Sequence, residues 1–270
     1  MRTERLQATP DHSGSALATE FAPAPGACAA AAAATTPAAS AAATSAYYEA
    51  YYRRRGADRN HLANPEVLFQ TLALEASVIR ALGSLPIDPT TSRVLDVGCG
   101  DGANLFPLLR MQFPPEKIVG VDLIPERIAR ARRLHPGIDW RQADARQLPF
   151  ANASFDVVFE STMFTTIVDD STARAIAEEM QRACRSGGWI VLVDWWMPKP
   201  GDTTVKALTY QRLNRLFDLR STLKLQKRFA GALAPPLGRF LSRWCPAAYF
   251  AVASVFPFTI AQGVYLLQKN

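Results

Sequence analysis

Short apolar runs alternate with amphipathic stretches through residues 92–196. Buried strands are predicted where branched or aromatic residues cluster between polar and turn-forming ones, at 94–95, 118–122, 138–140, 154–160 and 189–193. Helices are predicted where apolar residues recur at helical spacing, at 103–111, 125–134 and 170–185. This alternation favours an α/β fold: a doubly wound, Rossmann-like parallel sheet with helices on both faces and a ligand crevice at the carboxyl ends of its strands.

The pattern continues on both sides of this core. Asn64 and Pro65 are typical of an N-cap and a first-turn proline, so a helix is expected from there to about Ala81. After the core, a helix is expected over 202–219 and strands over 223–229 and 263–268. One domain, 46–270, accounts for all of these elements. Its first segment also holds four tyrosines at the spacing of one helical face: Tyr47, Tyr48, Tyr51 and Tyr52.

Residues 234–258 form an apolar insert between the last two expected strands. Pro246 and Pro257 interrupt it, and Arg239 and Arg243 lie beside its aromatic residues, so it is too broken to span a bilayer. Three interpretations are open, in order of preference: a cap over a substrate pocket, a dimer interface, or a patch that contacts a membrane peripherally. The sequence does not fix the oligomeric state.

Composition separates the first 45 residues from the rest. Residues 1–45 are rich in Ala with Pro, Thr and Ser, and they are predicted to be disordered because large apolar residues are missing. No compact apolar run of the secretory type follows Arg2 and Arg5. The net charge of +6 allows weak affinity for anionic surfaces but does not predict a nucleic-acid partner. A reducing, cytoplasmic location is favoured by four scattered cysteines with no metal or disulfide spacing: Cys28, Cys99, Cys184 and Cys245.

Residues 94–102 read VLDVGCGDG and are expected to form a cofactor-binding turn between a strand and a helix. Gly98, Gly100 and Gly102 let the backbone turn sharply and approach a ligand closely. Their spacing is Gly-x-Gly-x-Gly, whereas dinucleotide-binding turns have Gly-x-Gly-x-x-Gly. Asp96 and Asp101 crowd the turn and would repel a diphosphate, so a ligand with positive charge is favoured.

This segment resembles the first motif of class I S-adenosylmethionine-dependent methyltransferases, whose cofactor carries an ammonium and a sulfonium. Two further features support the resemblance: Asp122 ends an apolar run 20 residues beyond Gly102, and residues 142–145 read QADA. The resemblance covers the core 92–196 closely and the rest of 46–270 loosely. It implies a seven-stranded sheet with an antiparallel last strand, and a helical lid, 46–85, over the cofactor.

The resemblance also implies roles in cofactor binding. Asp122 is expected to accept hydrogen bonds from the ribose hydroxyls, with Leu123 or Ile124 against the adenine. Asp144 is expected to accept from the adenine amino group, with the backbone of Ala145 beside it. Cys99 is expected to be a small packed residue within the turn. The full set of expected cofactor-binding residues is Asp96, Gly98, Cys99, Gly100, Asp122, Leu123, Asp144, Ala145 and Glu160.

Residues after the fourth and fifth expected strands would face the transferred methyl group. If the acceptor must lose a proton, Glu160, Asp194 or His61 could serve as the base, and no spacing identifies which. The segment after Glu160 reads STMFTTI, unlike the Asn/Asp-Pro-Pro-aromatic motif of enzymes that methylate amines of nucleic-acid bases. Asp194 is followed by Trp195, where magnesium-binding relatives have Asn, so no metal is expected.

The resemblance implies methyl transfer from S-adenosyl-L-methionine to an oxygen, nitrogen or carbon of a small or medium-sized, partly apolar acceptor. Catalysis would rest mainly on positioning. The alternatives are an RNA methyltransferase and a module that binds S-adenosylmethionine without reacting. A nicotinamide oxidoreductase would need the longer glycine spacing.

Overall fold

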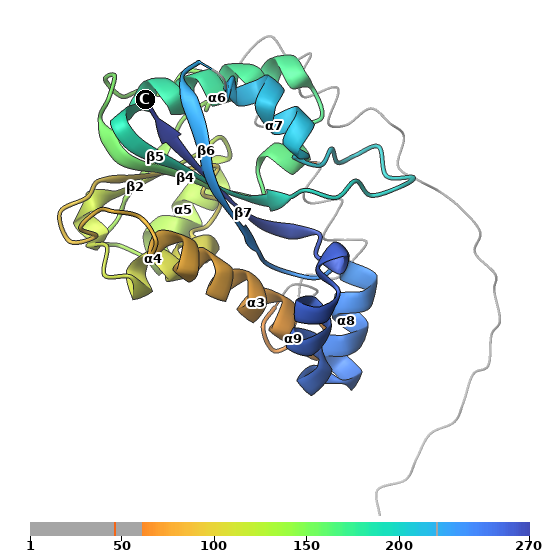
Figure 1. The fold of residues 1–270 in the computed structure, drawn as a ribbon. Helices are drawn as coiled ribbons and strands as arrows, with labels where there is room; N and C mark the ends of the chain where they lie inside the picture. Colours follow the sequence, from red (N-terminus) through yellow and green to blue (C-terminus); the bar gives the residue numbers. More distant parts are fainter. Residues whose placement is uncertain (1–45, 47–60, 220) are drawn as a thin grey trace, which may run out of the picture.

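The computed structural model describes residue 46 and residues 61–219 and 221–270 (Figure 1). The predicted disordered tail, 1–45, and the tyrosine-rich segment before residue 60 lie outside the described residues. The described chain forms one seven-stranded sheet with helices on both faces. The predicted α/β, doubly wound architecture is therefore confirmed.

The strands follow the order β3-β2-β1-β4-β5-β7-β6 across the sheet. Neighbours among β1 to β5 pair in parallel, while β7 runs antiparallel to both β5 and β6. The antiparallel last strand agrees with the prediction. The strand bounds are β1 Val94–Val97, β2 Ile118–Asp122, β3 Asp139–Gln142, β4 Phe155–Ser161, β5 Cys184–Trp195, β6 Leu223–Ala230 and β7 Gln262–Lys269.

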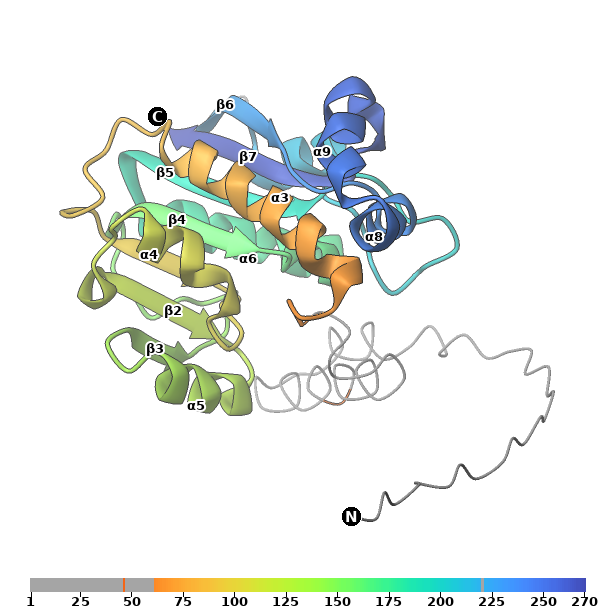
Figure 2. The ribbon, with the colours of Figure 1, turned by 90° about the horizontal axis from the view of Figure 1, so that it is seen from below.

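Two helical layers bury the sheet (Figures 1 and 2). All residues of β1 are buried, as expected for a parallel strand covered on both faces. Leu95 belongs to the core beneath α6 and α7, whereas Val94 belongs to the core beneath α3, α4 and α5. The bounds of these helices are α3 Pro65–Leu82, α4 Phe106–Arg110, α5 Pro125–Leu134, α6 Asp170–Ala183 and α7 Tyr210–Phe217.

The helix expected over 202–219 is shorter in the structure, because α7 begins only at residue 210. The amide of Lys206 donates to the carbonyl of Thr165 at 2.8 Å, and the amide of Leu208 donates to the carbonyl of Trp195 at 2.7 Å. These bonds lay 206–208 against the 3-10 turn after β4 and against the end of β5. The amides of Lys206 and Leu208 therefore donate to other segments and do not form helical hydrogen bonds.

Two other element boundaries differ from the prediction. Residues 184–188, expected to end a helix, form the beginning of β5, and Lys269 Nζ satisfies carbonyls at the end of α6 by donating to Gln181 and Cys184 at 2.7 and 2.8 Å. The segment 103–111 divides into a 3-10 turn, Ala103–Leu105, and the short helix α4. Gly102 adopts the left-handed conformation and is followed by the 3-10 turn. The α-helix therefore begins one turn later than predicted.

Helix α3 begins as predicted. The side chain of Asn64 accepts a hydrogen bond from the amide of Glu66 at 3.0 Å, and Pro65 occupies the first turn. The helix then packs along β6 and β7 and beside α8, Pro235–Trp244, with Ala73, Val78 and other small or branched residues buried. Residues 65–82 thus belong to the helical layer of the sheet, whereas the sequence predicted a lid. Only the start of α3 reaches the carboxyl edge of the parallel strands (Figure 2).

The apolar insert folds as two short helices and a 3-10 turn between β6 and β7. These are α8, α9, Pro246–Val255, and η5, Pro257–Thr259. Leu241 of α8 and Tyr249 of α9 join a small core with Ala73 of α3. Within the described part of the chain, no helix combines the length and the apolar character needed to cross a membrane.

Candidate active site

The turn after β1 requires glycine at two crowded positions. Gly98 has a φ of 72° and Gly102 a φ of 85°, in the left-handed region that side chains disfavour. A Cβ atom on Gly98 would lie 2.8 Å from Met163 Sδ, and one on Gly102 would lie 2.8 Å from the Trp140 ring. The Gly98 amide donates to the Val121 carbonyl at 2.8 Å, which ties the turn to the end of β2.

Asp122 closes the turn from the neighbouring strand. Its Oδ2 accepts a hydrogen bond from the amide of Gly100 at 2.9 Å, and its Oδ1 accepts one from the amide of Ile124 at 2.9 Å. A carboxylate offers about four lone-pair positions. Asp122 therefore fixes the glycine turn and retains acceptor capacity for a ligand.

Asp96 lies beneath the same turn and is 1% exposed. Neither of its carboxyl oxygens has a hydrogen-bond partner among the described residues. Burial, with a smaller contribution from the negative charge of Asp122, raises the pKa of Asp96 to about 8. Leaving a buried polar group unsatisfied is costly, which indicates that a ligand supplies the missing donor.

Glu160 and Asp194 form a second buried acidic pair at the ends of β4 and β5. Glu160 Oε2 accepts from the Met163 amide at 3.0 Å, while Oε1 has no partner among the described residues. Burial and then the charge of Asp194 raise the pKa of Glu160 well above its ordinary value. Burial likewise raises the pKa of Asp194 to about 6, although hydrogen bonds from Thr165 and from the Trp195 amide oppose the shift.

The four acids end four adjacent parallel strands, β2, β1, β4 and β5, and so line one edge of the sheet. Strand register divides them between the two faces. Asp96 pairs with Gly120, so Asp96 and Asp122 share one face. Glu160 pairs with Leu192, so Glu160 and Asp194 share the other. This concentration of buried carboxyl groups suits a ligand that carries positive charge, because such a ligand favours their ionised form.

The matches to known proteins fall on this same edge. A family model described as a methyltransferase domain matches residues 94–188. Phosphatidylethanolamine N-methyltransferase of Cereibacter sphaeroides is 39% identical over 108 residues, which are 38% of this chain and 50% of the relative. Malonyl-[acyl-carrier protein] O-methyltransferase of Hahella chejuensis is 36% identical over 120 residues, which are 44% of this chain and 42% of the relative. These matches support the assignment of residues 94–188 to the class I S-adenosylmethionine-dependent methyltransferase family.

The fold of this chain also matches solved structures. A TehB-like S-adenosylmethionine-dependent methyltransferase from Corynebacterium glutamicum aligns over 84% of this chain and 99% of its own, with a TM-score of 0.52 and 18% identity. At that identity the match supports the fold alone. This chain spans about half the length of the curated relatives it matches.

The residues at the carboxyl edge fit the family's cofactor, S-adenosylmethionine. Its ammonium can donate to the unsatisfied carboxyl of Asp96, and its ribose can donate to the remaining lone pairs of Asp122. The open turn gives a ligand access to the backbone at Gly100, where a Cβ would have, within the described part of the chain, only Arg127 in contact distance, at 3.9 Å. The cofactor predicted from the sequence thus agrees with the family and with the chemistry of these residues.

Asp144 differs from the other predicted cofactor residues because it already has a strong partner within this chain. Arg146 donates to both carboxyl oxygens, with Nη2 2.6 Å from Oδ2 and the backbone amide 2.9 Å from Oδ1. Burial works against ionisation of Asp144, but the bonds from Arg146 outweigh it and lower the pKa of the carboxyl. An adenine amino group would have to share Asp144 with Arg146, a residue that the sequence reasoning missed.

Three other predicted cofactor residues, Cys99, Leu123 and Ala145, differ in burial. Cys99 is 3% exposed, and burial, followed by the charges of Asp96 and Asp122, raises the pKa of its thiol. It is therefore a packed thiol, as predicted, and not a thiolate nucleophile. Leu123 and Ala145 are both half-buried.

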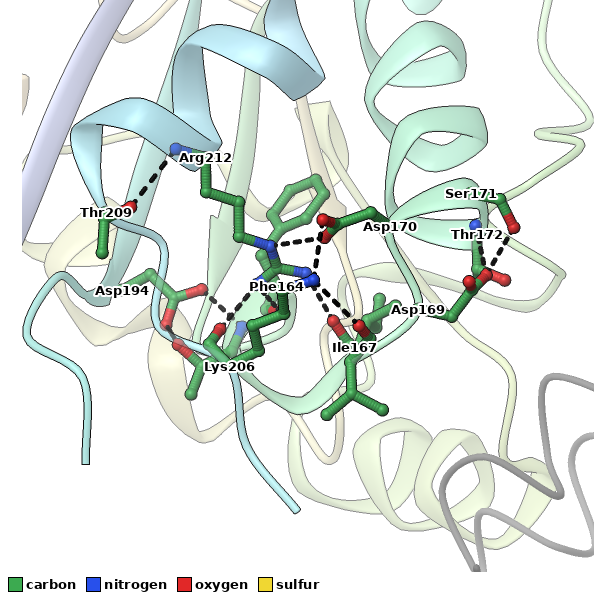
Figure 3. Close-up of polar contacts among 12 residues, drawn as sticks. Phe164, Ile167, Asp169, Asp170, Ser171, Thr172, Asp194, Lys206, Thr209 and Arg212 are labelled. Atoms are coloured by element: carbon green, nitrogen blue, oxygen red, sulfur yellow. Dashed lines mark hydrogen bonds and ion pairs between the residues drawn. The ribbon is translucent and has the colours of Figure 1, made fainter. Parts of the chain in front are cut away.

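A buried arginine, Arg212, is the main feature of this site that the sequence did not reveal (Figure 3). It is 1% exposed and forms an ion pair with Asp170, with Nε 2.9 Å from Oδ1. Its guanidinium also donates to the carbonyls of Phe164 and Ile167. These two residues belong to the loop after β4, so Arg212 fixes the segment that follows Glu160. Nothing in the local pattern of α7 distinguishes Arg212 from its exposed neighbour Arg215.

The remaining predicted base, His61, lies in the exposed turn before α3. Its Nδ1 accepts a hydrogen bond from the amide of Ala63 at 3.1 Å. Glu160 and Asp194, in contrast, come together in one buried cluster. The structure therefore brings together two of the three candidate bases and gives His61 a local partner.

The predicted lack of a metal site stays a prediction. Over residues 61–219 and 221–270, no three His, Cys, Asp or Glu side chains form a group suited to a metal ion. Both oxygens of Asp194 accept hydrogen bonds, from Thr165 and from the Trp195 amide.

Proposed function

We propose that this protein transfers a methyl group from S-adenosylmethionine to an oxygen, nitrogen or carbon of a small or medium-sized, partly apolar acceptor. The buried and unsatisfied carboxyl of Asp96, beneath the glycine turn, is the observation that carries the proposal. The named relatives methylate nitrogen in one case and oxygen in the other. They support the reaction class and leave the acceptor atom open.

When bound, S-adenosylmethionine supplies a methyl group on a positively charged sulfur. The task of the protein is to hold the acceptor in line and to exclude water, which contributes up to about 7–11 kcal/mol to lowering a barrier. The loop after β4 is suited to that task because it is held on two sides. Asp194 accepts from the amide of Thr165 at 2.9 Å, and Arg212 donates to the carbonyl of Phe164 at 3.0 Å.

Glu160 is the favoured proton acceptor if the acceptor must be deprotonated. Its Oε1 is free among the described residues, whereas both oxygens of Asp194 are engaged with Thr165 or Trp195. A raised pKa makes a carboxylate a stronger base once it is ionised. Asp194 then acts by positioning the loop and by its charge on Glu160.

Calorimetry of the full chain with S-adenosylhomocysteine and with NADH tests the cofactor class. Micromolar or tighter binding of the first ligand and none of the second is expected. Asp96→Asn should weaken the binding, whereas Asp101→Asn should not, because Asp101 is paired with Arg130 at 3.0 Å on the surface. Binding of NADH would contradict the proposal.

Transfer itself is tested by incubating the protein and methyl-labelled S-adenosylmethionine with extracts of the source cell. A labelled product that disappears in Glu160→Gln, while S-adenosylhomocysteine affinity stays unchanged, would support a role at the acceptor. Cofactor binding without any labelled product would favour the binding-module alternative.

A further inference from the structure

The apolar insert exposes an unusual concentration of large side chains. We call their exposed group the aromatic surface. It lies on α8, α9 and η5, at one corner of the molecule (Figure 2). Scattered exposed apolar residues are normal, but a group on one corner indicates a contact with something else. The aromatic surface comprises Phe240, Trp244, Phe250, Val255, Phe256 and Phe258, which are 46–73% exposed.

Helix α9 is the centre of this feature. Residues 244–259 contain no Asp, Glu, Lys or Arg, and within them only Tyr249 is buried. Tyr249 anchors the helix, because its hydroxyl accepts a hydrogen bond from the Leu233 amide at 3.1 Å. A helix that is apolar on all sides is normally buried in a core or in a membrane. Among the described residues, the chain covers only one side of α9.

The C-terminal segment that contains the insert is also one-sided in charge. Residues 219–270 contain seven Lys and Arg and no Asp or Glu, so this segment carries more than the whole net charge of +6. Lys224 and Lys227 are exposed on the edge strand β6, and Lys224 lies opposite Gln268, at the end of the β6–β7 pair away from the insert. The basic residues of the insert itself are Arg239 and Arg243, and Glu66 of α3 also lies 3.8 Å from Arg239. Arg243 lies on α8 with its guanidinium carbon 5.0 Å from the Trp244 ring centre, and it also pairs with Glu66 at 3.1 Å.

We infer that the aromatic surface docks on a lipid bilayer with anionic headgroups. Exposed aromatic side chains beside basic residues, with no acidic residue in the segment, match the requirements of an interfacial contact. Each of α8 and α9 spans ten residues, and Pro246 separates them, so the insert would lie in the interface and not cross it. Trp244, which is 65% exposed, is the residue type favoured at the headgroup level.

Two other occupants fit the same observations less well. A second copy of this chain would bring two segments of the same positive charge together, which opposes association. A cap over the acceptor requires these side chains to cover the crevice, yet Trp244 and Phe258 are 65% and 73% exposed. An anionic bilayer would bury the exposed apolar side chains and attract the positively charged segment. The docking does not depend on the proposed methyl transfer.

The test is co-sedimentation of the full chain with vesicles of phosphatidylcholine alone and with about 30 mol % phosphatidylglycerol. Binding to the anionic vesicles should be at least about tenfold tighter than to the neutral ones and should weaken as salt is added. Trp244→Ser/Phe258→Ser should lose at least about tenfold in affinity for the anionic vesicles. The matched control is Tyr210→Ser, which removes a 54% exposed aromatic residue from α7 and should bind as the wild type does.

Failure of the wild type to bind anionic vesicles would overturn the inference. So would a dimer in light scattering that the double variant converts to a monomer, since a second copy would then occupy the surface. Melting curves of each variant show whether it is folded. If the double variant unfolds, Phe258→Ser alone gives the test, and unchanged vesicle binding by that folded variant also counts against docking.

Discussion

Arg212 and Asp194 hold opposite sides of one loop. Arg212 donates to the carbonyls of Phe164 and Ile167, while Asp194 accepts from the amide of Thr165 and from its hydroxyl. The positive charge of Arg212 also helps to offset the effect of burial on the pKa of Asp194. The loop after β4 is thus fixed by residues from two different elements (Figure 3).

Replacing Arg212 should therefore lower the stability of the folded protein substantially. Arg212→Met removes the guanidinium donor of three carbonyls, those of Phe164, Ile167 and Lys206, and leaves Asp170 with Lys206 as its remaining cationic partner. The change should lower stability by about 3 kcal/mol, or roughly 6–12 °C in melting temperature. Arg215→Met is the control, because Arg215 is exposed on the same helix and the change should cost less than about 0.5 kcal/mol. Equal melting temperatures for the two variants would contradict the role assigned to Arg212.

Asp122→Ala should weaken S-adenosylhomocysteine binding at least about tenfold, because each charge-assisted hydrogen bond to a ribose hydroxyl contributes about 1.5–3 kcal/mol. The change also removes the acceptor for the Gly100 amide, so the glycine turn loses part of its support. Calorimetry measures the affinity. Asp101→Ala, in the same turn, is the matched control and should leave it within about twofold, since the exposed Asp101–Arg130 pair contributes little.

The sequence predicted the features that depend on local pattern. Asp96 and Asp122 each follow a short apolar run, and parallel strands bring such residues to one edge of a sheet. Asn64 was recognised as a cap because capping needs only a polar side chain and a helix start. Cys99 was expected to be packed because the turn around it is made of glycine.

The features that were missed depend on contacts between distant segments. Arg212 is 48 residues from Phe164, whose carbonyl it reaches, and an amphipathic pattern does not tell a buried arginine from a solvated one. The sequence predicts a helix over 202–209, because nothing in the local pattern shows that amides of this segment donate to Thr165 and Trp195 on other elements. The sequence predicts 65–82 as part of a lid, because the strands that this helix covers, β6 and β7, lie far along the chain and leave no signal near the helix.

Cofactor affinity should depend on pH through Asp96. The pKa of this buried carboxyl is about 8, so it is largely protonated at neutral pH, and binding of an ammonium favours its ionised form. S-adenosylhomocysteine affinity should rise between pH 6 and pH 8, by up to about tenfold per pH unit, with release of a proton. Calorimetry in two buffers with different ionisation enthalpies measures that proton.

Two variants identify the group that releases the proton on ligand binding. Asp96→Asn should bind more weakly and with an affinity that changes much less with pH. Asp101→Asn should keep the pH dependence of the wild type. If Asp96→Asn retains the full slope, the released proton comes from another group, such as Glu160.

Glu160 should make the protein less stable as pH rises. A carboxyl whose pKa is higher in the folded state than the unfolded value of about 4.3 binds its proton more tightly when folded. Its contribution to stability is therefore greatest below that value and is lost as pH increases toward the raised pKa. Gln resembles the neutral acid and does not titrate.

Glu160→Gln should consequently melt at nearly the same temperature as the wild type at pH 5 and at a higher temperature at pH 8. Other titrating groups, including Asp96, are present in both proteins, so the difference between the two curves reports the titration of Glu160 together with its effect on the neighbouring Asp194. Asp194→Asn provides the contrast, because Asp194 accepts from the amides of Thr165 and Trp195 and an amide side chain cannot replace both oxygens. It should lower the melting temperature at both pH values. A lower melting temperature of Glu160→Gln at pH 8 would show that the ionised carboxylate, bonded to the Met163 amide, is the stabilising form.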